Sequence, residues 1–386
     1  TTAAEQRCAF RSRERSAVGV GVMSSSSPNP PLMEMEFEAV LDVSNQQLEG
    51  IGVGFDIDPA VEEIDLTATR TRKIENLQHC SNLKKLGLRQ NLIPRIEGLE
   101  RCVQLVYVDL YDNQIRRIEG LNNLVQLRYV DLSFNKIREL EGLDSCEQLE
   151  ELYLIRNRIQ EVQRIDHLAH LRVLELGQNR LRTIHGVDAL TSLTSLWLGA
   201  NKIERIENLD SLVNLRIISL QKNRLTRIEG LDALVNLEEL YVSENGITEI
   251  SGLESLERLI ILDVANNSIE KLDGVAHLHQ LQEFWANDNK ISDMRELQKL
   301  SGLCNLQVAF FQGNPIAQVP RYRPKVSGIL TSLRELDSLP LMQRLLEDQH
   351  PNSVNAVTGS GSTEGAVATT GEPFEEEEEK EGSQSS

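Results

Sequence analysis

The sequence predicts an α/β solenoid of about twelve stacked 22-residue repeats, with a parallel β-sheet on the concave face, a convex side of 3₁₀, irregular or short helical turns, and a C-terminal cap. Three observations predict it. An asparagine recurs every 22 residues, leucine or isoleucine recurs at fixed offsets from it, and 40% of the 386 residues are hydrophobic, enough for a large core. The recurring residues are Asn91, Asn113, Asn135, Asn157, Asn179, Asn201, Asn223, Asn245, Asn267 and Asn289, followed after 25 residues by Asn314.

Each repeat is predicted to contain a strand, a turn and a return leg. In LTSLWLGANKIERIENL, Leu196 and Leu198 alternate with residues that face the other way, so we expect a short strand with its leucines inward. The asparagine that follows turns its amide inward and pairs with backbone groups, which repeats as a ladder between coils. With 22 residues per coil, the return leg is too short for a long helix.

Two other positions recur on the return leg. Cys80, Cys102 and Cys146 share one that leucine holds in later repeats, so we expect small core residues rather than redox or metal groups. Glycine recurs at the second, where a turn needs permissive backbone. These glycines are Gly98, Gly120, Gly142, Gly186, Gly230, Gly252 and Gly274.

The chain is predicted to have four parts. Residues 1–60, which include SSSSPNPP, form a disordered or loosely attached segment, with Met23 as the natural start if the residues before it are translated leader or a fragment's edge. Residues 61–314 form the repeats. Residues 315–339, where prolines interrupt the period, form a cap over the last coil. Residues 340–386 end in FEEEEEKEGSQSS and are predicted to be an acidic disordered tail.

Composition and charge argue against several classes of function. No run approaches the roughly 18 apolar residues of a membrane span. A net charge of −19, without Lys and Arg clustered along the chain, argues against nucleic acid as a partner. Five cysteines form neither a disulfide framework nor a zinc motif, which suits the nucleus and cytoplasm. We find no phosphate loop, nucleophile elbow or metal cluster, so we expect no enzyme, no metal and no cofactor.

The repeat frame also predicts which side chains face the concave side. In LQEFWANDN, Phe284 takes the inward position and is expected in the core, whereas Trp285 is expected to face outward. Aromatic side chains collected on one face among carboxylates are typical of a protein interface. The residues four before each asparagine include Asp109, Asp131, Tyr153, Glu175, Trp197, Ser219, Tyr241, Asp263, Trp285 and Phe310, and Glu283 is among those six before.

The pattern LxxLxLxxNxI resembles the leucine-rich repeat in its short form, over residues 61–339. The segments RIEGL, LELGQNRLR, LVNLEELYVSENGI, LQEFWANDN and NPIAQVPRYRPKV together resemble the leucine-rich repeat regulatory subunit of protein phosphatase 1, of the regulatory subunit 7 type. The resemblance implies a non-catalytic subunit whose concave face binds the phosphatase catalytic subunit. The residues it implies are Asp131, Tyr153, Glu175, Trp197, Glu283, Trp285 and Phe310, and the repeat frame adds Tyr241 and Asp263 between them.

This sequence departs from that family at aromatic positions. Tyr153 and Trp197 stand where the relatives have Phe, and Phe310 stands where they have Tyr. The chain has no basic-Val-x-Phe docking peptide, so binding is expected to use the solenoid. We expect a monomer when the protein is free.

A second hypothesis keeps the architecture and changes the partner. The chain would then be a leucine-rich repeat scaffold or adaptor for another complex, axonemal or ribonucleoprotein. Co-purification of the phosphatase catalytic subunit would separate the two hypotheses. The sequence leaves open whether binding inhibits, stabilises or retargets the phosphatase.

Overall fold

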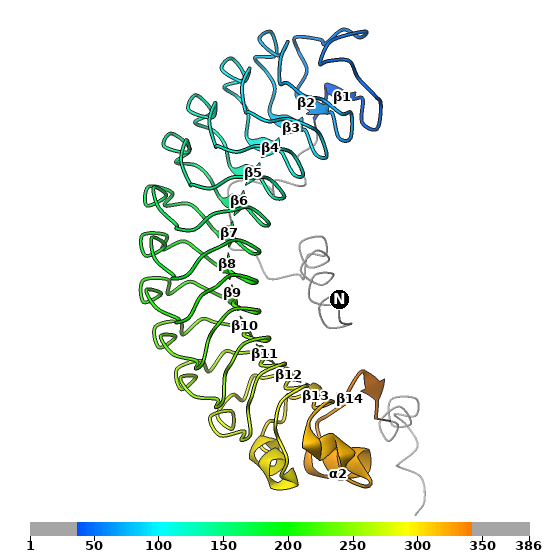
Figure 1. Cartoon of the computed structure of the whole chain (residues 1–386), viewed down its shortest axis with the longest axis vertical. Helices are drawn as coiled ribbons and strands as arrows, with labels where there is room; N and C mark the ends of the chain where they lie inside the picture. Colours follow the sequence, from blue (N-terminus) through cyan, green and yellow to red (C-terminus); the bar gives the residue numbers. More distant parts are fainter. Residues whose placement is uncertain (1–36, 342–386) are drawn as a thin grey trace, which may run out of the picture. The chain divides into compact units, whose positions relative to one another are not determined.

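The computed structural model describes residues 37–341 of the chain. The remaining parts of the predicted N-terminal segment and acidic tail, 1–36 and 342–386, lie outside the described residues. In the described part, the coils stack in sequence order into a curved solenoid with the strands along its inner side (Figure 1). The predicted parallel-strand repeat solenoid is therefore confirmed.

One sheet holds the fifteen strands of the described residues in the order β1 to β15. Neighbours from β1 to β14 are parallel, and β15 turns back antiparallel to β14. The strands are β1 (Val40–Asp42), β2 (Glu63–Asp65), β3 (Lys85–Gly87), β4 (Tyr107–Asp109), β5 (Tyr129–Asp131), β6 (Glu151–Tyr153), β7 (Val173–Glu175), β8 (Ser195–Trp197), β9 (Ile217–Ser219), β10 (Glu239–Tyr241), β11 (Ile261–Asp263), β12 (Glu283–Trp285), β13 (Val308–Phe310), β14 (Glu335–Leu336) and β15 (Leu339–Pro340).

Equivalent residues of successive repeats lie side by side in this sheet. Leu174 pairs with Leu196, which in turn pairs with Ile218. The middle residue of each repeat strand points into the coil, and Leu196 and Phe284 are both fully buried. The predicted core position of Phe284 is thus confirmed, and the leucines of all coils form one continuous core.

The asparagine ladder is also confirmed. Asn201 Nδ2 donates to the carbonyl oxygens of Leu176 and Leu198, each at 3.0 Å. Its Oδ1 accepts a hydrogen bond from the Leu181 N–H at 3.0 Å. Each ladder asparagine therefore joins two coils by pairing backbone groups that would otherwise be buried without partners.

The recurring glycine allows two coils to approach closely. Gly142 has a φ of +69°, and a Cβ on it would lie 2.1 Å from the carbonyl oxygen of Ile118 in the preceding coil. Glycine is needed there both for its backbone conformation and for lack of space. Asn208 occupies the equivalent position with a φ of +61°, and its Nδ2 donates to the Ile184 carbonyl at 2.6 Å.

The return legs are turns and bends, as predicted, and the repeat before β13 contains a 3₁₀ helix, η2 (Met294–Leu300). Cys80, Cys102 and Cys146 are buried among the leucines of these legs. Their predicted place in the core is confirmed. Burial raises the pKa of the Cys102 thiol to about 12, which keeps it protonated and unreactive.

The N-terminal end differs from the prediction. Leu41 of β1 pairs with Ile64 of β2, and Val43 and Ile51 are buried in the shared core. The expectation of a loosely attached segment is therefore wrong for residues 37–60, which form a first coil. This coil lacks the ladder asparagine and the leucine spacing, so the repeat period does not identify it.

At the C-terminal end, the repeats are followed by a 3₁₀ helix, η3 (Pro315–Gln318), and a helix, α2 (Tyr322–Ile329). Val326, Leu330 and Leu333 are almost fully buried. The chain then returns to the sheet as β14. This segment covers the core that the last coil would otherwise expose.

Candidate functional site

The first and third residues of each repeat strand lie on the concave side, and their chemistry changes along the solenoid. Two groups stand out. The tyrosine region, on β4 to β6, consists of Tyr107, Asp109, Tyr129, Asp131 and Tyr153. The tryptophan cluster, on and next to β8 to β13, consists of Trp197, Ile217, Tyr241, Ile260, Ile261, Trp285 and Phe310.

The tyrosine region is an aromatic stack with polar edges. Tyr107 and Tyr129 hold the first position of adjacent strands, and their rings stack with centroids 4.2 Å apart and planes 8° apart. The Tyr153 ring lies 5.3 Å from that of Tyr129. The Tyr153 hydroxyl donates to Glu151 Oε2 at 2.7 Å. The stack therefore presents hydroxyl groups and carboxylates together with ring edges.

The aspartates of the tyrosine region also hold the backbone. Asp131 Oδ1 accepts a hydrogen bond from the Ser133 N–H at 2.8 Å, and Asp109 Oδ1 accepts one from Tyr111 N–H at 3.1 Å. Burial raises the pKa of Asp109 to about 6, and the charge of Asp131 adds to the effect, although Arg89 pairs with it at 3.0 Å. These carboxylates are therefore partly structural, which their place on the concave face did not reveal.

Glu175 on β7 lies between the two groups. Its Oε1 accepts a hydrogen bond from the Gly177 N–H at 2.7 Å. Burial raises the pKa of Glu175 to about 8, despite this hydrogen bond, which favours the charged form. The carboxyl group therefore titrates close to neutral pH.

The tryptophan cluster is a continuous apolar surface. The Trp197 and Tyr241 ring centroids lie 6.2 Å apart, and those of Tyr241 and Trp285 also lie 6.2 Å apart. Phe310 closes the row edge-on to Trp285 at 6.0 Å. Ile217 and Ile261 pack between the rings from the first strand position. Contacts between aromatic rings add to the burial of apolar area, so the cluster is a rigid unit.

Small side chains under the rings make the cluster possible. Ser219 and Asp263 hold the third position on the two strands between the large aromatic residues, and both are buried. Asp263 Oδ2 accepts a hydrogen bond from Ser243 Oγ at 2.6 Å. Burial raises the pKa of Asp263 to about 6. The predicted contact residue Asp263 thus lies beneath the rings rather than beside them.

The two tryptophans differ in exposure. Trp197, at one end of the cluster, is partly exposed on the concave side. Trp285 is only 9% exposed, because Tyr241 and Phe310 pack on it from both sides. Trp285 therefore lies on the concave side, as predicted, but neighbouring rings cover most of it. Its Nε1 is buried and has no hydrogen-bond partner among residues 37–341.

The nine residues predicted to contact a partner all lie on concave-face strands between β5 and β13, and that role stays a prediction. Glu283 stands apart from both groups, between Ile261 and Val308 on the neighbouring strands. The prediction omitted Ile217, although an apolar residue at a strand position that is polar in many repeats is a usable signal. Four of the nine predicted residues belong to the tryptophan cluster, namely Trp197, Tyr241, Trp285 and Phe310.

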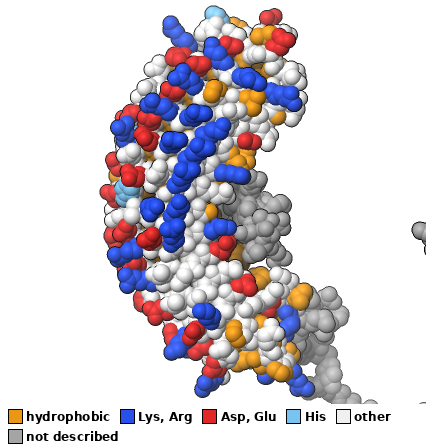
Figure 2. Space-filling model, viewed as in Figure 1, with side chains coloured by type: hydrophobic (Ala, Val, Ile, Leu, Met, Phe, Trp, Pro, Cys, Tyr) orange, Lys and Arg blue, Asp and Glu red, His pale blue; other side chains and the backbone are white. Residues whose placement is uncertain are grey.

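The flank at the carboxyl ends of the strands is basic. The residue after the ladder asparagine is Lys or Arg in five consecutive repeats, and Lys and Arg side chains form a row there (Figure 2). These residues are 22 apart in the sequence, so the conclusion that Lys and Arg are not clustered is wrong for the folded chain. The basic row consists of Lys136, Arg158, Arg180, Lys202 and Arg224.

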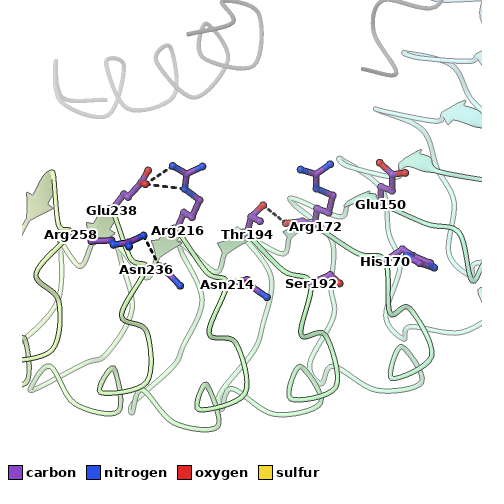
Figure 3. A pocket seen from close by; sticks show the side chains of 10 residues that line it. All are labelled: Glu150, His170, Arg172, Ser192, Thr194, Asn214, Arg216, Asn236, Glu238 and Arg258. Carbon is purple, nitrogen blue, oxygen red and sulfur yellow. Dashed lines mark hydrogen bonds and ion pairs between the residues drawn. The ribbon is translucent and has the colours of Figure 1, made fainter. Parts of the chain in front are cut away.

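The opposite flank has a shallow groove of about 620 Å³, lined by polar side chains (Figure 3). Most of its charged groups are engaged. Arg216 pairs with Glu238 at 2.5 Å, and Arg258 donates to Asn236 Oδ1 at 2.8 Å. Arg172 forms no ion pair with another described residue. The groove has no apolar wall and no convergent unpaired groups that would favour a small ligand.

Neither a metal centre nor a membrane span is found in the part of the chain that the structure describes. Within residues 37–341, no three His, Cys, Asp or Glu side chains are placed to hold a metal ion together. In the same residues, no helix has the length and apolar character needed to cross a bilayer.

Comparisons with known proteins agree with this architecture. The family model described as leucine-rich repeats (2 copies) matches residues 103–145, 169–211 and 213–255. The chain is similar in structure to an internalin, InlF, of Listeria monocytogenes, with a TM-score of 0.60 and 24% identity over 73% of this chain and 88% of that one. It is similar to a leucine-rich repeat protein of Leptospira interrogans, with a TM-score of 0.60 and 22% identity over 71% and 78%.

One segment matches a curated relative, protein phosphatase 1 regulatory subunit pprA of Dictyostelium discoideum. The two are 45% identical over 53 residues, which is 14% of this chain and 16% of that protein. The match therefore spans a small part of either protein. The family-model matches, the parallel sheet and the structural neighbours agree on one conclusion: the chain folds as a leucine-rich repeat solenoid.

Proposed function

We propose that this chain is a non-catalytic regulatory subunit that binds the catalytic subunit of protein phosphatase 1 through its concave face. The observation that carries the proposal is the tryptophan cluster, an aromatic surface on the open side of the sheet in a chain with a net charge of −19. Aromatic anchors surrounded by polar groups are the usual centre of a protein interface.

The extent of the site favours a folded partner. Trp197 and Phe310 lie on β8 and β13, five strand spacings apart, so their backbones are about 24 Å apart at about 4.8 Å per spacing. The tyrosine region extends the surface to β4. A metabolite or a short peptide side chain cannot reach both groups, whereas a protein surface of ordinary interface size can.

Two similarities support the choice of partner. The segments that resemble regulatory subunits of the phosphatase lie in the repeats and at the cap, and one segment matches a protein named as such a subunit. The carboxylates of the concave face suit a partner with basic groups at its rim. Interface contacts would then come from Trp197, Glu175 and Glu283 as well as the tyrosine region.

Co-purification tests the proposal. The full chain, tagged and mixed with purified phosphatase 1 catalytic subunit, is expected to retain it on the column at physiological salt. A Trp197→Ala variant is expected to retain much less. If the wild-type chain retains none, the proposal is wrong, and the scaffold for another complex becomes the better hypothesis.

A further inference from the structure

The basic row is a second surface, on a different face from the proposed phosphatase site. Backbone hydrogen bonds fix its spacing, because each member donates its N–H to the preceding repeat, as Arg158 does to Ile137 and Arg180 to Ile159, both at 2.8 Å. Adjacent members are therefore one strand spacing apart, about 4.8 Å, and the row is about 19 Å long.

The fold does not require basic residues at this position. Other repeats carry Leu92, Gln114, Gly246 and Ser268 there, and their coils stack in the same way. Like charges on neighbouring strands oppose each other and lower stability. Five basic residues in succession therefore oppose folding slightly, and the solenoid offers no structural reason for them.

The charges of the row are largely uncompensated. Arg224 lies 3.8 Å from Glu204, in a pair whose side chains are both more than half exposed. Lys136 contacts the neutral Gln114 at 3.5 Å. The three central members, Arg158, Arg180 and Lys202, form no ion pair with another residue of the described part of the chain. A rigid row of cations is thus available to an external anion.

We propose that the basic row binds an extended acidic segment of a partner polypeptide. An extended chain rises about 3.3 Å per residue, so the row of about 19 Å matches about six residues. Every second side chain of such a segment would face the row. The three unpaired cations at the centre of the row favour a segment that carries Asp, Glu or phosphorylated residues, because opposite charges attract.

The dimensions and the total charge favour a peptide over a nucleic acid. The row is one residue wide, whereas a nucleic acid needs basic groups over a broader surface or aromatic groups on which bases stack. The chain has 59 acidic and 40 basic residues, so a long polyanion would be repelled outside the row. A short acidic segment meets only the row itself.

Fluorescence anisotropy with a labelled twelve-residue peptide of alternating Glu and Ser tests this inference at low salt. The full chain should bind it, and binding should weaken as salt rises. The double variant Arg158→Glu with Arg180→Glu should bind at least about tenfold more weakly, because two attractive ion pairs with the peptide become repulsive. Arg172→Glu, an exposed arginine on the opposite flank, is the matched control and should bind like the wild type.

Several results would overturn the proposal. The double variant could bind like the wild type, or the control could lose as much affinity as the double variant. A twelve-nucleotide single-stranded DNA could bind more tightly than the peptide, which would make nucleic acid the ligand. A chain lacking residues 351–386 could bind at least tenfold more tightly than the full chain, which would make the chain's own tail the occupant. Since no concave-face residue is changed, retention of the phosphatase by the double variant is a separate measurement.

Discussion

The tyrosine region and the tryptophan cluster are built on the same strand and turn, yet they present different surfaces. On β4 and β5 of the tyrosine region, tyrosines hold the first strand position and aspartates hold the third, so the two rings stack directly and the carboxylates cap the backbone. In the tryptophan cluster, large rings hold the third position on β8, β10, β12 and β13, and Ser219 and Asp263 are buried on the two strands between the first three rings.

The difference shows that the spacing of large and small residues, rather than the backbone, determines the chemistry of each half. The repeat fixes the backbone position and the face of the sheet from which each side chain projects. Neighbours one or two strands away decide whether it is covered, as Phe310 on the adjacent strand and Tyr241 two strands away cover Trp285. A polar, partly titratable half and an apolar, rigid half therefore lie on one continuous sheet, which suits a partner whose own surface has both characters.

Replacing Trp285, the central ring of the tryptophan cluster, should give the largest difference in stability between the two halves. We expect Trp285→Ala to lower the free energy of unfolding by about 2–4 kcal/mol, because a buried aromatic side chain is lost from the cluster. Tyr107→Ala, at the open end of the stack, should cost only about 1 kcal/mol. Urea denaturation followed by circular dichroism measures both. Equal losses at the two sites would contradict the distinction between a rigid cluster and an open stack.

Trp285→Phe provides a matched control. It keeps a ring in the cluster and removes the buried Nε1, which has no partner among residues 37–341. Its cost should be below that of alanine, about 1 kcal/mol or less, because an unsatisfied donor disappears with the indole.

The ladder should behave alike under both halves. Asn135 lies beneath the tyrosine region and Asn289 beneath the tryptophan cluster, and each is 7% exposed. Each accepts the N–H of a residue in the preceding coil at 2.9 Å, from Ile115 and Ile269 respectively. Alanine at either position should cost about 1–3 kcal/mol, since buried backbone groups lose their partner. Clearly unequal losses of stability would mean that the two halves differ in their backbone ladder as well as in their concave-face side chains.

The pH dependence of stability should be set by the buried carboxyl groups of the concave face. The pKa of Glu175 is raised to about 8 in the folded chain, from an ordinary value near 4.3. Its contribution to stability is therefore fully present below about pH 4 and is lost as pH rises through about 8. Glu175→Gln should be more stable than the wild type at pH 8.5, by on the order of 1 kcal/mol for this partly buried group.

Denaturation of the Glu175→Gln variant and the wild type at pH 4.5 and pH 8.5 measures this effect. The difference between them should shrink at the lower pH, where the wild-type carboxyl group is neutral. A difference that is the same at both values would mean that Glu175 does not titrate in this range.

Most of the fold follows from the repeat period, because each 22-residue unit carries its own strand, asparagine and return leg. The first coil could not be predicted from the period, because Val43 and Ile51 are buried in the core although their coil lacks the repeat motif. The site is only partly predictable. The period assigns Trp285 and Asp263 to the concave side, but their burial depends on rings from other strands. The basic row does not show as a run of Lys and Arg in the sequence, because its members become neighbours only when the coils stack.

The most direct test of the proposed function is the affinity of the phosphatase 1 catalytic subunit for the Trp197→Ala variant, measured by isothermal titration calorimetry. Trp197 is the partly exposed end of the tryptophan cluster, so its loss should remove an anchor without unfolding the chain. We expect binding to weaken by about 2 kcal/mol or more, about thirtyfold. Val235→Ala, which changes an exposed residue outside the strands, should bind like the wild type. A folded Trp197→Ala variant with wild-type affinity would contradict the proposed role of the concave face.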